Sequence, residues 1–339
     1  MIPFIRDSGE IVTSTYTIIR AILRSVHVHH FQGGPVPRLD SWNIALYSLL
    51  VVMRSFVVNH ARDLSTLRTL TDFPIIPKLP LRSRSCHIHI QSIHTEIVWP
   101  ANMGNKNPLI EPSSKLRVVI YLHGGGGALC SSRTHQIITH MMAVRSNTVV
   151  VVPNYRRVPE VSLLHSIEDG IAVYIEIVQA VDASQVALCG DSAGGTLVVN
   201  TLCRLRNDGI ALPRCAVLFS PWCDITRVPS LPSRVDYLTQ DVIGFMIELL
   251  TETTMDLSSL NPMEMDLRGL PPMLIQFGDS ELFEDQIRAF TKRCETNDLK
   301  VTLKEYHEMV HIPHFFCFLS AEGDRAMTDA ALFLVHNLF

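Results

Sequence analysis

The stretch that decides the fold is Gly190-Asp191-Ser192-Ala193-Gly194-Gly195, which follows a short apolar run at 185–189 and precedes a helical pattern at 196–200. A turn of the form Gly-x-Ser-x-Gly between a strand and a helix raises the serine above the end of the strand, and small neighbours keep the strained turn free of collisions. The motif alone is also typical of an ordinary glycine-rich turn. Because a strand and a helix flank it here, we interpret it as a nucleophile elbow that presents Ser192.

The segments around this turn alternate between strand and helix patterns. Short apolar runs bounded by turn residues recur along the chain, at 116–122, 148–152, 185–189, 215–219, 273–277 and 301–306. Residues 86–90 and 95–98 alternate in polarity, as half-buried strands do. Apolar runs separated by helical segments predict an α/β fold with a mostly parallel, doubly wound sheet flanked by helices.

Two further regions depart from this rhythm. Residues 1–80 have a helical, amphipathic pattern with a proline-rich end, and residues 222–268 have no strand pattern but include a helical stretch at 242–250. We therefore predict an N-terminal helical cap region at 1–80 and a catalytic domain at 81–339, in which 222–268 is a cap insertion. An insertion of that length exceeds what a helical crossover needs, and it would lie over the carboxyl end of the sheet.

The most apolar stretch, 44–58, is too short to span a bilayer and contains Arg54. We interpret it as a helix that covers the active site, with peripheral contact to a membrane or lipid surface as the alternative. The N-terminus does not resemble a signal peptide, because charged residues interrupt it early. A cytoplasmic location is the resulting prediction.

Composition narrows the function classes. The 339 residues are 47% hydrophobic and 18% charged, with a formal net charge of −4, which offers no electrostatic attraction to nucleic acid. The eight cysteines have no metal-type pairing, so we interpret them as thiols in a reducing compartment. His27, His29 and His30 are close in sequence, but no carboxylate or cysteine accompanies them at ligand spacing, and we expect no metal.

A second glycine-rich segment, His123-Gly124-Gly125-Gly126-Gly127, follows the run at 116–122. It lacks the Gly-Lys-Ser/Thr ending and the Gly-x-Gly-x-x-Gly spacing of phosphate-binding loops. Glycines allow backbone N–H groups to point into a site without a Cβ in the way. One such N–H, together with that of Ala193, would stabilise an oxyanion, and one donor of this kind contributes about 3 kcal/mol of transition-state stabilisation.

A serine nucleophile also needs a base and an acid, in the chain order Ser, acid, His. Three histidines follow the last predicted strand, namely His307, His311 and His314. The loop after the run at 273–277 offers four carboxylates, namely Asp279, Glu281, Glu284 and Asp285. Residue chemistry alone leaves the choice among them open.

Together the motifs resemble the hormone-sensitive-lipase-like branch of the α/β-hydrolase superfamily. The resemblance extends from about residue 115 to the end of the chain. Its motifs, in the family's order, are His123-Gly124-Gly125-Gly126, Tyr155-Arg156-Arg157-Val158-Pro159-Glu160, Gly190 to Gly195, Ser220-Pro221-Trp222-Cys223-Asp224, Leu270-Pro271-Pro272, and the acid and histidine loops. It implies an α/β-hydrolase fold with a helical cap, and a serine carboxylesterase without a cofactor.

By the same resemblance, Ser192 is the nucleophile, Glu281 the acid and His311 the base. Asp285 would fix the acid loop, and the oxyanion would be held by the N–H groups of Gly124, Gly125 and Ala193. Two departures stand out. A glutamate at the acid position is less usual than an aspartate, which keeps Asp279 as an alternative, and Arg157 replaces a residue that is normally apolar or small.

The predicted function is a serine carboxylesterase or deacetylase that hydrolyses small or medium acyl esters through an acyl-enzyme on Ser192. An acyltransferase that uses the same triad is one alternative, and a non-catalytic ligand-binding member of the fold is another. The expected partner is a small-molecule ester. The natural substrate, the acyl length and the oligomeric state do not follow from the sequence.

Overall fold

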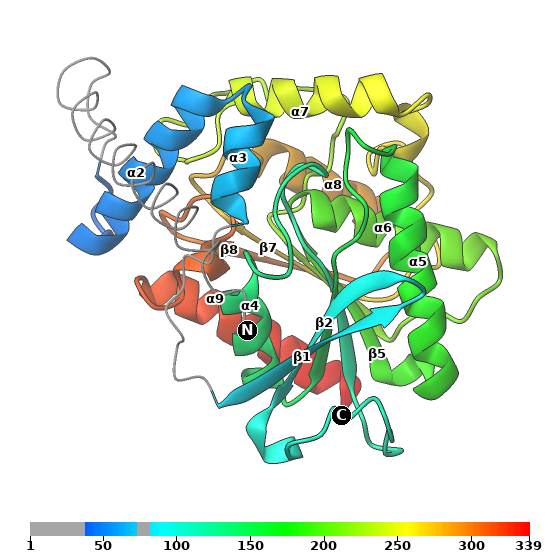
Figure 1. Cartoon of the computed structure of the whole chain (residues 1–339). Helices are drawn as coiled ribbons and strands as arrows, with labels where there is room; N and C mark the ends of the chain where they lie inside the picture. Colours follow the sequence, from blue (N-terminus) through cyan, green and yellow to red (C-terminus); the bar gives the residue numbers. More distant parts are fainter. Residues whose placement is uncertain (1–37, 73–81) are drawn as a thin grey trace, which may run out of the picture.

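The computed structural model describes residues 38–72 and 82–339, and its centre is a single mostly parallel sheet (Figure 1). The strand order is β1-β2-β4-β3-β5-β6-β7-β8. Strand β1 pairs antiparallel with β2, and β2 with β4, whereas the remaining neighbours are parallel. The strand bounds are β1 Ser83–Ile90, β2 Ile93–Pro100, β3 Val118–Leu122, β4 Val149–Pro153, β5 Val186–Asp191, β6 Cys215–Phe219, β7 Met273–Gly278 and β8 Val301–Tyr306.

Helices cover both faces of the sheet because side chains of the central strands alternate between two apolar cores. On β3, Val118 and Ile120 contribute to one core, while Val119 and Tyr121 contribute to the other. The first core is completed by α5 Leu163–Ala180, α6 Ala193–Asn207 and α8 Glu284–Thr296. The second is completed by α4 Gln136–Ser146 and α9 Ala321–Leu338. Short 3-10 turns lie at Ala101–Met103, Ala183–Gln185, Ser258–Leu260 and Pro313–Phe316.

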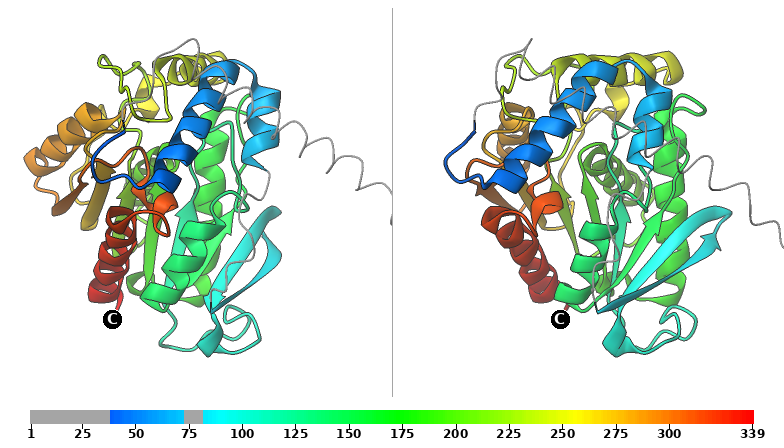
Figure 2. Two further views of the ribbon diagram at one scale, coloured as in Figure 1. Left: turned by 90° about the vertical axis from the view of Figure 1, so that its left-hand side faces the viewer. Right: turned by 60° about the vertical axis from the view of Figure 1, so that its left-hand side comes forward.

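Three more helices lie together beyond one end of the sheet (Figure 2): α2 Ile44–His60, α3 Leu64–Thr71 and α7 Gln240–Thr253. Helix α7 lies against the glycine-rich loop after β3, since a Cβ on Gly126 would come within 2.8 Å of Met246 Sδ. These helices therefore cover the carboxyl ends of the parallel strands, where catalytic residues of such sheets gather.

Helix α2 is attached to the loop that follows β8. The side chain of Asn43 caps its first turn by accepting from Leu46 N–H at 2.9 Å. Leu46 and Leu50 are buried in a third apolar cluster, which includes Met309 and Val310. The indole Nε1–H of Trp42 donates to the backbone oxygen of Glu308 at 2.6 Å. The N-terminal helix thus packs on the segment that precedes His311.

The predicted fold class is confirmed. All eight predicted strand runs form strands, and the apolar stretches at 44–58 and 242–250 lie in helices α2 and α7. The division at residue 80 stays a prediction, and the histidines at 27, 29 and 30 lie outside the described residues, as do 1–37 and 73–81. No helix within 38–72 and 82–339 is long and apolar enough to cross a membrane.

Candidate active site

Ser192 lies at the sharp turn between β5 and α6. Its backbone has φ 52° and ψ −123°, a strained conformation for a residue with a side chain. Its N–H donates to the oxygen of Phe219 at 2.9 Å, which joins the turn to the end of β6. The turn tolerates no added Cβ at its flanking glycines, because such an atom would lie 2.5 Å from Gly194 O at Gly190 and 2.0 Å from Leu122 O at Gly194. This is the elbow geometry that the sequence predicts.

Glu281 and His311 form a buried pair. Oε1 of Glu281 lies 3.3 Å from Nδ1 of His311, and the two side chains are 0% and 2% exposed. The contact orients the imidazole, because a carboxylate at Nδ1 leaves Nε2 as the free ring nitrogen. Within the described residues, Ser192 Oγ forms no hydrogen bond with His311. Such contacts are commonly long before substrate binds.

The alternative residues occupy other environments. Asp279 pairs with His307, whose side chain is 74% exposed, through a 2.9 Å contact between Oδ2 and Nδ1. His314 is buried, stacks on Phe219 at 3.7 Å between ring centroids and contacts Gln276. Neither His307 nor His314 contacts Glu281. The structure therefore brings together Glu281 and His311 and separates Asp279 from that pair.

A residue that the sequence motifs contained but left without a role holds the pair in place. Ser220 follows β6 at a φ of 43°. Its hydroxyl donates to Glu281 Oε2 at 2.6 Å and accepts from the N–H of Ile312 at 2.9 Å. The second oxygen of Glu281 also accepts from Gly278 N–H at 2.9 Å. Ser220 directly follows Phe219, whose backbone oxygen accepts the hydrogen bond from Ser192 N–H. The segment 219–220 therefore contacts the turn at Ser192, the side chain of Glu281 and the loop of His311.

His311 is surrounded by negative and aromatic groups. Burial opposes the imidazolium, but the carboxylates of Glu281, Asp236 and Asp191 outweigh burial and raise the pKa of His311. The ring also meets Phe283 edge-on at 5.2 Å and Tyr237 at 6.0 Å between centroids. A base with a raised pKa accepts a serine proton more readily, provided that it is neutral before the reaction.

The glycine-rich loop requires one correction. The N–H of Gly124, expected to face the oxyanion, donates instead to Asp191 Oδ1 at 2.9 Å and so points into the core. The N–H groups of Gly125 and Gly126 have no acceptor in the described part of the chain, and φ values of 110° and 64° turn this loop sharply. The Ala193 N–H lies in the first turn of α6, where helical N–H groups lack intrahelical partners.

The sequence motifs contain Asp191 but imply no role for its side chain. Its buried carboxylate accepts from Tyr121 Oη at 2.7 Å and lies 3.1 Å from His135 Nε2, in addition to holding Gly124. Burial alone would raise the pKa of Asp191, but His135 and Tyr121 outweigh it and lower that pKa. An ionised carboxylate therefore ties the glycine-rich loop to the residue before Ser192.

The acid loop is fixed by a different carboxylate from the one expected. Asp285 lies in the first turn of α8, where a negative charge favours the helix. The N–H groups of Leu282 and His311 are instead bound by Asp236, from the segment before α7. No pattern around Asp236 in the sequence signals this, because its partners lie far away along the chain.

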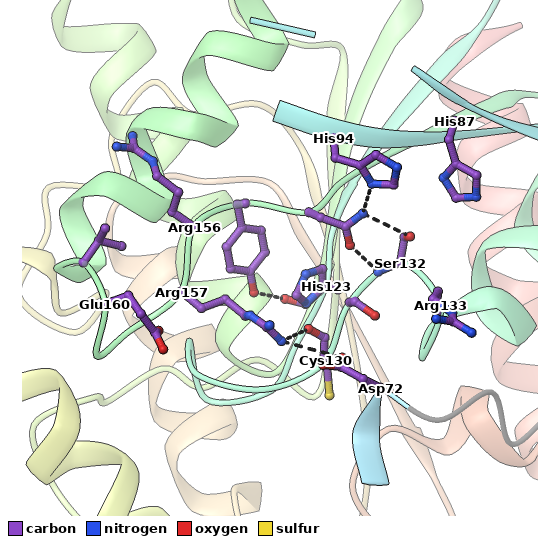
Figure 3. Close-up of a pocket in the computed structure, with 14 residues that line it drawn as sticks. Asp72, His87, His94, His123, Cys130, Ser132, Arg133, Arg156, Arg157 and Glu160 are labelled. Carbon is purple, nitrogen blue, oxygen red and sulfur yellow. Dashed lines mark hydrogen bonds and ion pairs between the residues drawn. The ribbon is translucent and has the colours of Figure 1, made fainter. Parts of the chain in front are cut away.

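A cavity of about 730 Å³ lies on another side of the glycine-rich loop. Figure 3 shows His123, Cys130 and Arg157 at this cavity, with His87 and His94 on the neighbouring hairpin. Ser192, Glu281 and His311 do not line it, so this cavity is separate from the three candidate catalytic residues. Within residues 38–72 and 82–339, no group of histidine, cysteine, aspartate and glutamate side chains could hold a metal ion.

Comparisons with known proteins agree with this geometry. The family model of the alpha/beta hydrolase fold matches residues 119–315, more than half of the chain. An acetyl-hydrolase of Streptomyces hygroscopicus is 34% identical over 224 residues, covering 64% of this chain and 75% of that protein. An esterase of Acinetobacter venetianus is 26% identical, covering 79% and 92%.

Among solved structures, a mutant esterase superposes with a TM-score of 0.78 at 26% identity, covering 88% of this chain and 100% of the other. An esterase from the bacterial hormone-sensitive lipase family superposes with a TM-score of 0.70 at 24% identity, covering 96% and 99%, which supports the fold. The chain therefore belongs to the α/β-hydrolase fold family, and its motifs are those of the hormone-sensitive-lipase-like branch.

Proposed function

We propose that this carboxylic ester hydrolase acts on short acyl esters, acetyl esters among them, through an acyl-enzyme on Ser192. The observation that carries the proposal is the buried contact between Glu281 and His311, on loops joined by Ser220 to the strained turn at Ser192. The name of one relative adds support, since that protein is an acetyl-hydrolase.

The reaction has two halves. In the first, His311 Nε2 takes the Ser192 proton as Oγ attacks the ester carbonyl, and Glu281 stabilises the imidazolium that forms. His311 then gives that proton to the leaving alcohol as the carbon–oxygen bond breaks. In the second half, His311 takes a proton from water, which attacks the acyl-enzyme, and returns it to Ser192 as the acid leaves.

The developing oxyanion would be stabilised by the N–H groups of Gly125, Gly126 and Ala193. Gly126 replaces Gly124 in this role because the Gly124 N–H is already bound by Asp191. Helix α7 restricts the space beside this loop through Met246, which agrees with a short acyl chain. We also propose that α2 serves as a cover and not as a lipid contact, since its own side chains Leu46 and Leu50 are buried against the rest of the protein.

Chromogenic acetyl, butyryl and octanoyl esters test the proposal. We expect turnover of the acetyl and butyryl esters, a sharp decrease at octanoyl, and covalent labelling by a fluorophosphonate probe. Ser192→Ala should abolish both turnover and labelling. Equal turnover by the wild type and Ser192→Ala would exclude the mechanism, and preferential transfer of the acyl group to an added alcohol would identify an acyltransferase instead.

The cellular location remains a separate proposal. All eight cysteines of the chain are free thiols in the structure. Six of them are buried, and burial raises the pKa of each of these six thiols. Little reactive thiolate forms at such sites, and unpaired cysteines are typical of proteins in reducing compartments. We therefore propose a reducing compartment such as the cytoplasm, and a tagged protein followed by microscopy would test it.

A further inference from the structure

One buried carboxylate outside the proposed triad contacts both loops that carry it. Asp236 lies in the segment between β6 and α7 and is 0% exposed. Its Oδ2 accepts from the N–H of Leu282 at 2.7 Å, directly after Glu281 in the chain. Its Oδ1 accepts from the N–H of His311 itself at 3.3 Å. A single side chain therefore bridges the acid loop and the histidine loop.

We propose that Asp236 is a positioning residue for the reaction: its carboxylate holds the backbone of His311 against the backbone beside Glu281 and thereby sets the contact between the imidazole and its acid. This inference rests on the proposed function, since it assumes that His311 is the base. In this role Asp236 exchanges no proton with Ser192 or the attacking water and does not touch the substrate.

The donors around Asp236 explain why a carboxylate is needed. The N–H of Leu238 also donates to Oδ1, at 3.3 Å, so three backbone donors converge on one buried side chain. A carboxylate accepts on both oxygens, whereas an amide would direct its own NH₂ group at one of these donors. A buried donor without an acceptor costs about 1–3 kcal/mol. An amide at position 236 therefore cannot hold both loops at once.

The charge of Asp236 acts on His311 as well. Burial raises the pKa of Asp236 to about 6, His311 opposes this rise, and Glu281 adds to it. At neutral pH Asp236 is therefore mainly ionised. The other groups that face this centre are Asp191 from β5, Arg54 from α2 and Tyr237 beside Asp236. Arg54 also donates to the backbone oxygen of Asp236, which ties α2 to the same junction.

The test compares Asp236→Asn with the matched control Asp169→Asn. Asp169 is also a buried carboxylate that accepts from a backbone N–H, that of Arg156 at 2.8 Å, but it contacts neither loop of the proposed triad. Turnover of an acetyl ester is measured per active site, with the sites titrated by a fluorophosphonate, so that unfolded protein does not count. The pH profile of kcat/KM and the pKa of His311, followed by NMR and assigned through His311→Ala, complete the measurements.

For Asp236→Asn we expect kcat to fall about tenfold to a hundredfold, the size of an ångström-scale misplacement, with KM nearly unchanged. The pKa of His311 and the acidic limb of the profile should both move to lower pH, because a neighbouring negative charge is lost. Asp169→Asn should keep the wild-type kcat per site and His311 pKa, whatever it does to stability.

Two results would overturn the inference. One is a wild-type kcat per site in Asp236→Asn with a lowered Tm, which would assign Asp236 a purely structural role. The other is an unchanged His311 pKa by NMR. The NMR measurement needs no turnover, so it remains decisive if the wild type hydrolyses no ester. In that case the proposed function fails, and the shift of the His311 pKa in Asp236→Asn alone decides whether Asp236 acts on His311.

Discussion

At the scale of single residues, contacts and not residue type distinguish the two candidate acids. Glu281 faces the buried His311. Asp279, two residues before Glu281 in the same loop, faces instead the exposed His307, which follows β8. We expect Glu281→Gln to lower kcat about 10⁴-fold, as loss of the orienting carboxylate does in serine proteases. Asp279→Asn should remain within about twofold of the wild type. Turnover per titrated site measures both, and a reversed order would make Asp279 the acid.

Gly124 provides a second prediction at this scale. A Cβ at Gly124 would lie 2.1 Å from Asp191 Oδ2, and Tyr121 and His135 hold that carboxylate in place. We expect Gly124→Ala to displace the glycine-rich loop, to lower the free energy of unfolding by about 1–3 kcal/mol and to reduce kcat through the disturbed N–H groups at 125 and 126. Urea unfolding and ester turnover measure the two effects. Normal values of both would mean that the loop is not held by Asp191.

The sequence predicts the roles of some residues of the proposed site but not of others. Ser192 is predicted because its motif is local: a strained turn needs small neighbours, and those neighbours are visible in the sequence. His311 is chosen among three histidines only through the family resemblance. The role of the Gly124 N–H could not be predicted, since it depends on where Asp191 lies after β3 and β5 pair. Asp236 has no local signal at all, because its partners lie 46 and 75 residues away along the chain.

At the scale of secondary structure, strand and helix existence follow from local pattern. The run at 273–277 is apolar and bounded by turns, and it forms β7 with one further residue, Gly278. The ends of helices are harder to predict from the sequence, because each end is fixed by a single capping side chain. Thr239, which accepts from Val242 N–H at the start of α7, is an example. How α2 and α7 pack over the sheet was expected only in outline, since the residues they bury against come from distant loops.

Helix α7 contains a glycine that the fold does not require. The nearest atom to an added Cβ at Gly244 is Val228 Cγ2, at an ordinary contact distance of 3.7 Å. We expect Gly244→Ala to raise the free energy of unfolding by about 0.5–1 kcal/mol, since alanine loses less backbone entropy in a helix. Urea unfolding measures the change, with turnover expected to stay unchanged. Destabilisation would indicate that α7 needs close contact at this position.

The attachment of α2 gives another prediction for an element. Trp42 is 1% exposed and donates to Glu308 O, three residues before His311. We expect Trp42→Ala to cost about 3–5 kcal/mol of unfolding free energy through the cavity it leaves, and to lower kcat by loosening the histidine loop. Trp42→Phe is the control, because it keeps most of the packing and loses one hydrogen bond worth about 1 kcal/mol. Equal effects of the two substitutions would contradict a packing role.

At the scale of the whole molecule, the proposed site is assembled from segments that meet only after the sheet forms. The elbow follows β5, the oxyanion loop follows β3, the acid follows β7 and the histidine follows β8. The insertion before α7 adds Asp236, and the N-terminal helix α2 reaches the same junction through Arg54. Stability and activity are therefore coupled. Buried ionisable groups near the site have different pKa values in the folded and unfolded protein, so their protonation changes the free energy of unfolding.

That coupling predicts how stability depends on pH. Burial lowers the pKa of both His123 and His314 to about 3, while each is near 6.5 in the unfolded chain. The unfolded state therefore binds two more protons between these values, and stability falls as the pH falls. Asp236 acts in the opposite direction between about 4 and 6, because its folded pKa of about 6 exceeds the unfolded value of 3.8.

Two histidines against one aspartate give a net uptake of about one proton on unfolding, so the free energy of unfolding should fall by about 1.4 kcal/mol per pH unit from pH 6 to 5. Below pH 5, carboxylates whose pKa is lowered in the folded protein, such as Glu160, add to this decrease. His314→Gln should make this dependence nearly flat, even though loss of its stacking on Phe219 lowers stability at every pH. His336→Gln, at an exposed position on α9, should keep the wild-type slope. Urea unfolding across this range measures the three slopes, and an unchanged slope in His314→Gln would show that His314 is protonated in the folded protein.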